Sequence, residues 1–138
     1  MIDNSYNTLI AKRDKTEQDY WNYVHANQQL QEKIERLYQA KKEISEQRDD
    51  FYAIKNAADK AAEESYQWKG DTYSKFRVNS TAITISNGFC YHAIERVLED
   101  IDDAIVRLEN QLYENESHMG WLKIQSMNIN SSIRKFGI

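Results

Sequence analysis

The residues with the greatest chemical potential are three histidines and one cysteine, and their spacing does not favour catalysis. His25, His92 and His118 belong to no H-E-x-x-H zinc motif, and none lies in the Glu-x-x-His motif of di-iron bundles. Cys90 and His92 lie two positions apart, so on a helix their side chains diverge. We therefore expect no catalytic residue, no metal and no cofactor, and we expect Cys90 to be a small buried side chain.

The composition restricts the fold to helices. The 138 residues include no proline and four glycines, whereas an average chain of this length carries about seven prolines and about ten glycines. All-β folds need many such turn residues. Aromatic residues make up 12% of the chain, which argues against disorder. The sequence predicts one all-α domain over 1–138, an elongated antiparallel helical hairpin with an additional C-terminal helical segment.

Apolar residues recur at steps of three and four along the first half of the chain, which predicts one long helix over about 4–66. The residues expected to face the second helix, called the seam below, include Tyr6, Leu9, Tyr20, Tyr23, Leu30, Ile34, Leu37, Ile44 and Phe51. In heptad register the seam also includes the polar residues Arg13, Asn27, Lys41, Arg48 and Lys55. Either their long side chains extend to water beside the seam, or residues such as Arg13, Asn27 and Lys41 face a helix of another protein.

The second half predicts a helix over about 72–115 and, after a break near Gly120, a final helix over about 119–135. Residues 78–90 contain alternating β-branched residues and Asn87-Gly88, which is a hairpin signal. Two isolated strands would be only marginally stable. We therefore predict helix there as well.

The turn between the two long helices is predicted at residues 67–71, which include Trp68 and Gly70. Gly70 suits a position of positive φ at a helix end, and Asp71 or Thr72 suits the cap of the next helix. With three tryptophans and four glycines in the chain, chance gives roughly 0.1 Trp-x-Gly motifs. Trp68 would either cover the end of the hairpin or insert between the helices of a partner.

Charge is uneven along the second half of the chain. From Glu95 to Glu116 there are eight acidic residues against two arginines, and after Glu116 the only charged residues are Lys123, Arg134 and Lys135. The acidic stretch is either a solvated helix face or a surface that steers a basic partner. No basic stripe exists that could displace counterions from nucleic acid, so we expect no nucleic-acid partner.

Trp68-Lys-Gly70 between two helices, followed by Phe76, resembles the WXG-type helical hairpins of type VII secretion. The long polar first helix is most similar to the YwqH-like small proteins encoded beside LXG-type toxins. The resemblance implies a non-enzymatic chaperone, targeting factor or co-secreted partner. Such a protein would bind the helical N-terminal domain of an LXG-type toxin, together with a second small helical protein in some assemblies. The tail after Gly120 departs from the shorter typical members.

The family export signal, Tyr-x-x-x-Asp/Glu, has one match in the second helix, formed by Tyr91 and Glu95. It lies earlier in the helix than the family pattern, and roughly 1.4 matches are expected by chance, so Tyr91 fits a packing role as well. The start of the chain lacks a secretory signal pattern. We expect a cytoplasmic protein without Sec export, with co-secretion by the type VII system as an alternative.

Two other functions fit the same sequence. A generic coiled-coil adaptor or self-associating structural protein would also use polar seam residues to fix its register. A membrane-active helical protein is suggested by the basic tail that contains Trp121, but its polar face has few Lys and Arg for anionic lipid. We therefore expect no stable membrane insertion.

Overall fold

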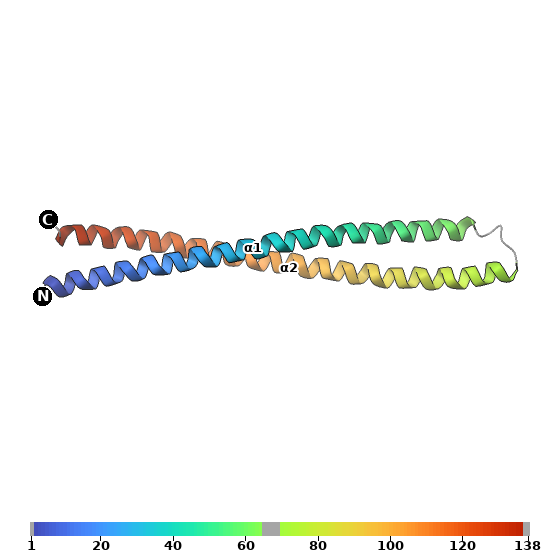
Figure 1. Ribbon diagram of the computed structural model, residues 1–138, viewed down its shortest axis with the longest axis horizontal. Coiled ribbons are helices and arrows are strands. Elements are labelled where there is room, and N and C mark those ends of the chain that lie inside the picture. The colour runs from blue at the N-terminus through green and yellow to red at the C-terminus, as the bar shows by residue number, and fades with distance from the viewer. Residues whose placement is uncertain (1, 65–69, 137–138) are drawn as a thin grey trace. The chain divides into compact units, whose positions relative to one another are not determined.

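The computed structural model describes residues 2–64 and 70–136, which form the two helices α1 (Ile2–Glu64) and α2 (Asp71–Phe136) (Figure 1). Side chains are described for all of these residues except 2–4, 62, 71–73 and 80. No strand occurs in the described ranges. The all-α prediction is confirmed, because a chain without proline and with few glycines lacks the residues that would interrupt long helices.

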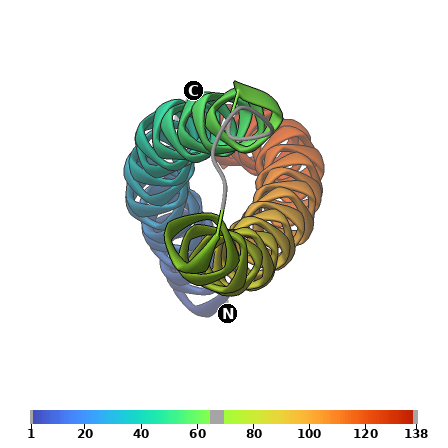
Figure 2. The ribbon, with the colours of Figure 1, turned by 90° about the vertical axis from the view of Figure 1, so that its right-hand side faces the viewer.

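Contacts divide the chain into two units. Unit 1 combines Met1–Arg36 with Ile105–Ile138, and unit 2 is Leu37–Ala104. Figure 1 shows the blue start of α1 beside the red end of α2 in unit 1. Figures 1 and 2 both show the green end of α1 next to the yellow-green start of α2 in unit 2. In each unit, a segment of α1 therefore packs against a segment of α2, as a helical hairpin requires.

In unit 1 the two helix segments run antiparallel. The rings of Tyr6 and Phe136 lie 6.2 Å apart, and those of Tyr23 and His118 lie 5.5 Å apart. The following residues are half-buried or buried and are separated by alternating steps of three and four: Leu9, Arg13, Thr16, Tyr20, Tyr23, Asn27, Leu30 and Ile34 of α1, and Ile105, Leu108, Leu112, Asn115, Met119, Leu122, Ser126, Ile129 and Ile133 of α2. This seven-residue repeat is the pattern of a coiled-coil seam.

Unit 2 is also an antiparallel pair, and two ion pairs join its helices. Lys41 Nζ lies 2.7 Å from Asp102 Oδ1, and Arg48 Nη1 lies 3.2 Å from Glu95 Oε1. Leu98 is the buried hydrophobic residue of this unit among those described. Lys55, which the heptad register assigns to the seam, is exposed instead.

The second helix differs from its prediction near the C-terminus. α2 continues from Asp71 to Phe136, so the break expected near Gly120 is absent and the segment 119–135 is the end of α2. A helix interior accepts a single glycine at a cost of about 1 kcal/mol, and favourable seam contacts on both sides of Gly120 offset that cost. Residues 78–90 are helical, as predicted.

The predicted turn can be compared with the structure at Gly70. Its φ is +79°, as expected of a glycine at a turn. It lies directly before α2, and the Ser74 N–H donates to the Gly70 carbonyl at 3.2 Å. Gly70 is thus the N-cap of α2, one position before Asp71 and two before Thr72, where the cap was expected. Glycine suits this position because it has no Cβ and so adopts the positive φ without strain, while its carbonyl, like that of any N-cap, receives the first helical hydrogen bond.

Candidate functional site

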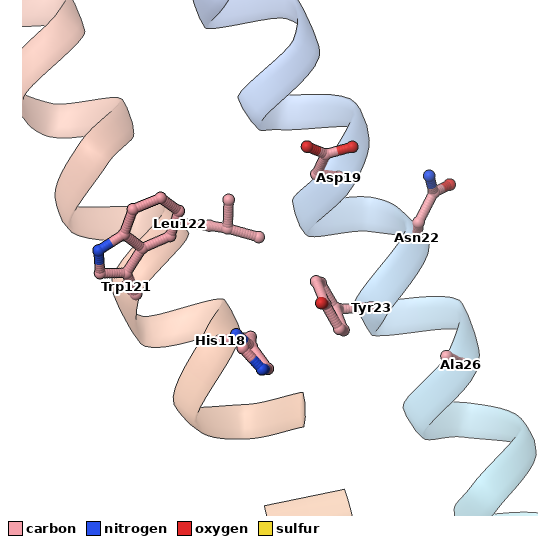
Figure 3. Close-up of a pocket in the computed structure, with 7 residues that line it drawn as sticks. All are labelled: Asp19, Asn22, Tyr23, Ala26, His118, Trp121 and Leu122. Carbon is pink, nitrogen blue, oxygen red and sulfur yellow. The ribbon is translucent and has the colours of Figure 1, made fainter. Parts of the chain in front are cut away.

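A groove opens between the helices of unit 1 around Tyr23. The cleft measures about 520 Å³. Its lining residues are Asp19, Asn22, Tyr23 and Ala26 of α1 and His118, Trp121 and Leu122 of α2. Figure 3 shows the side chains of Tyr23 and Leu122 directed toward the opposite helix, with His118 and Trp121 on the wall that α2 forms. The Tyr23 and His118 rings are stacked, with their planes 14° apart. We call this cleft the Tyr23 groove.

A second, smaller groove lies beside Leu122 and Trp21 and measures about 220 Å³. It is lined by Thr16, Glu17, Tyr20, Trp21, Leu122, Lys123 and Ser126. The Trp21 ring packs edge-on against the ring of Tyr20 with centroids 5.7 Å apart. Trp21 nevertheless remains 58% exposed. We call this cleft the Trp21 groove.

Leu122 lines both grooves, and it is one of few buried hydrophobic residues. Only Leu98, Ile105 and Leu122 are buried among the described hydrophobic side chains. Each helix has one neighbour within its unit, so the two helices meet along a single line and leave a groove on either side of it. Trp21 and Trp121, at the edges of these grooves, are 58% and 59% exposed. The grooves combine these tryptophans and Leu122 with polar and charged residues such as Asp19 and Lys123. Such a mixed lining is suited to bind an amphipathic helix, which has an apolar and a polar face.

Histidine, cysteine and acidic side chains are the groups that could bind a metal. The described residues contain no group of three or more His, Cys, Asp or Glu side chains that could hold a metal ion. His118 is stacked on Tyr23, and the ring of His92 lies 6.0 Å from that of Tyr91. In the same ranges neither helix has a stretch long and apolar enough to cross a membrane.

The polar seam residues contact the chain itself. Lys41 pairs with Asp102 of α2, and Arg13 pairs with the adjacent Asp14 at 3.3 Å. Asn27 is buried and donates from Nδ2 to the Met119 sulfur at 3.2 Å. Its Oδ1 atom is buried and accepts no hydrogen bond within the described residues. Arg13 thus contacts its own helix, whereas Asn27 and Lys41 contact α2.

The residues of the export-signal match lie against α1. The Tyr91 ring is 6.3 Å from that of Tyr52, and Glu95 is paired with Arg48. Both contacts belong to the packing of unit 2. Of the turn motif, Gly70 is the N-cap of α2 and Phe76 is a half-buried residue of that helix, whereas Trp68 lies outside the described residues.

Two features were not anticipated from the sequence. Cys90 is exposed, so the prediction of a buried cysteine was wrong: its neighbour Tyr91 takes the position against α1. The Tyr23 groove brings together Tyr23 and His118, and the Trp21 groove brings together Trp21 and Leu122. Sequence reasoning did not associate either pair, because its members belong to different helices and are far apart in the chain. The available signal was Trp21, a large apolar residue that lies beside the predicted seam and not in it.

No family model, no curated protein and no solved structure matches this chain.

Proposed function

We propose that this protein is a non-enzymatic helical partner, acting as a chaperone or targeting factor, that binds the helical N-terminal domain of an LXG-type toxin for type VII secretion. The binding surface is the pair of grooves in unit 1. The family assignment is based on the resemblance at Trp68, Gly70 and Phe76. The mode of binding, a helix docked in a groove, is based on the geometry of the grooves.

The observation that supports this function is the imbalance between buried and exposed apolar side chains. Among the described residues three hydrophobic side chains are buried, while sixteen large ones are exposed. Two of the sixteen, Trp21 and Trp121, line the grooves, and exposed apolar side chains that gather beside polar ones at a groove are typical of a site that a partner covers. A helix placed in the Tyr23 groove would cover Leu122, Tyr23 and Trp121 and would build a bundle from the existing pair.

The proposal is tested in two steps. Co-expression with an LXG-type N-terminal domain shows whether the two proteins co-purify. Isothermal titration of the separately purified proteins then measures their affinity. Trp21→Ala removes the wall of the Trp21 groove, and Ala26→Arg fills the Tyr23 groove. We expect at least one of them to weaken binding by roughly tenfold or more, which is about 1.4 kcal/mol. Gln18→Ala and Gln28→Arg are matched controls, because these exposed residues of α1 line neither groove.

Three outcomes would contradict parts of this proposal. If no LXG-type domain associates with the protein at micromolar concentration, the secretion function is wrong. If the protein forms a stable symmetric oligomer whose mass is unchanged by a toxin domain, the adaptor function takes its place. If both groove variants bind as the wild type does, the partner uses another surface.

A further inference from the structure

The outer face of α2 in unit 1 carries a second exposed apolar surface. Tyr113, Ile124 and Met127 are 72%, 57% and 64% exposed. With Ser117 and Gly120 they form a row separated by alternating steps of four and three, so they share one face of the helix. Asn115, Met119 and Leu122, which are buried or half-buried against α1, lie on the opposite face. We call the row 113–127 the outer face of α2.

Gly120 is the centre of this row, and the protein's own fold does not require a glycine there. Gly70 is the glycine with positive φ, so Gly120 has ordinary helical geometry. A Cβ at Gly120 would have no atom within 4 Å, so packing within this copy does not exclude a side chain. Glycine in a helix interior is unfavourable. A glycine at this point lets the backbone of another helix approach closely.

Charge on this face changes sign at its centre. Glu116 and Lys123 are exposed, lie on either side of Gly120, and make no ion pair within the described residues. Beyond them, Glu109 and Glu114 precede the centre together with one basic residue, Arg107, and the basic residues Arg134 and Lys135 follow it. A second helix is therefore favoured on this face if its basic end lies over the acidic end of α2.

The α2 helix itself has this complementary pattern when it is reversed. If two copies lie antiparallel with Gly120 against Gly120, Tyr113 of one copy faces Met127 of the other, because the two residues are equally far from the centre. Glu116 of one copy then lies near Lys123 of the other, twice by symmetry. A parallel arrangement would place like charges together. Such a self-complementary face is what a two-fold symmetric interface requires.

We propose that a second copy of this chain docks antiparallel on the outer face of α2, with the two helices crossing at Gly120 and with reciprocal Glu116–Lys123 ion pairs. This homodimer is separate from the toxin-partner function, which is assigned to the grooves. The experiment therefore measures the mass of the protein alone, so that a failure of the dimer and a failure of toxin binding are distinguished.

The test uses charge reversal and analytical ultracentrifugation. The wild type is expected to form a concentration-dependent dimer. Glu116→Lys and Lys123→Glu should each weaken the dimer by roughly tenfold or more, because each variant places like charges opposite each other. An equimolar mixture of the two variants should restore a dimer that contains one copy of each, since every facing pair is again opposite in charge. Glu99→Lys, a charge reversal outside the outer face, should leave the dimer unchanged.

The variants Gly120→Ala and Ile124→Asp distinguish an effect on dimerisation from an effect on the folding of the monomer. Gly120→Ala should raise the Tm of the monomer, because alanine favours helix, while it weakens the dimer by holding the helices apart. Ile124→Asp should abolish the dimer with unchanged helicity by circular dichroism. A protein that remains monomeric at all concentrations overturns the proposal, as does a dimer that tolerates Ile124→Asp and gains nothing from mixing the charge variants. Binding of a different protein to this face of a monomeric chain would also overturn it.

Discussion

Arg48 of α1 and Glu95 of α2 form a hydrogen-bonded ion pair across unit 2, with Nη1 3.2 Å from Oε1. Arg48 lies at a seam position, and the acid that it meets flanks the seam of the other helix. Partial desolvation lowers the pKa of Arg48, but the hydrogen bond and the charge of Glu95 outweigh it and raise this pKa above the ordinary arginine value. A cation in the seam of α1 is thus satisfied by the chain itself.

Removing the charge of Glu95 should therefore destabilise unit 2 slightly. Glu95→Gln is expected to lower the Tm, because it weakens the contact with Arg48, whereas Glu99→Gln should not, because exposed Glu99 makes no ion pair within the described residues. Circular dichroism during thermal unfolding measures both. Equal effects of the two variants would show that net charge, not the Arg48 contact, is responsible.

The pH dependence of the Arg48 contact follows from the direction of its pKa shift. A folded pKa above the unfolded value gives stability that is complete below the unfolded pKa and is lost as the pH rises through the folded pKa. Both values lie far above neutrality. The difference in unfolding free energy between the wild type and Arg48→Met should thus be constant from about pH 7 to about pH 9. Urea denaturation at several pH values tests this, and a difference that shrinks over that range would contradict it.

Asn27 is expected to cost the protein stability. Its Oδ1 atom is buried and unpaired within the described residues, and such a group costs about 1–3 kcal/mol. Asn27→Leu should therefore raise the unfolding free energy of the protein by about 1–2 kcal/mol in urea denaturation. Asn22→Leu, on the exposed surface of the same helix, should change it by no more than about 0.5 kcal/mol. A loss of stability in Asn27→Leu would show that the Met119 contact or a bound water outweighs the unpaired oxygen.

Substitutions at two adjacent residues show whether packing is confined to one face of α2. Leu98 is 6% exposed and Val97 is 44% exposed. Leu98→Ala should lower the unfolding free energy by about 2–3 kcal/mol, and Val97→Ala should lower it by about 0.5 kcal/mol or less. Similar losses at the two positions in urea denaturation would mean that both faces of α2 are covered in solution.

Gly70 and Gly120 should respond in opposite ways to the same substitution. A Cβ at either position has no atom within 4 Å, so the backbone alone decides the outcome. Gly70 has a φ of +79°, and Gly70→Ala should lower the unfolding free energy by about 1–2 kcal/mol. Gly120→Ala should raise it by about 1 kcal/mol, measured at a concentration low enough to keep the protein monomeric. The same sign at both positions would show that helix propensity is not the controlling factor.

Local sequence predicted the helices well because their determinants are local. The absence of proline and the three-and-four spacing required only neighbouring residues to be compared. The positive φ of Gly70 was predictable for the same reason. Gly120 was misjudged as a break, because a glycine signals a helix end only when the flanking residues do not hold the helix in place, and here Met119 and Leu122 both face α1.

The sequence alone determined that the chain is all-α and where most seam residues lie, because the periodicity of a helix can be read from consecutive residues. It assigned Lys55 to the seam wrongly. Only the tertiary structure decided which partners the polar seam residues have. Asp102 and Glu95 neutralise Lys41 and Arg48 because antiparallel packing brings together residues that are distant in the chain. It also decided that Trp21 and Trp121 edge open grooves, since two helices meet along one line and leave their flanks uncovered.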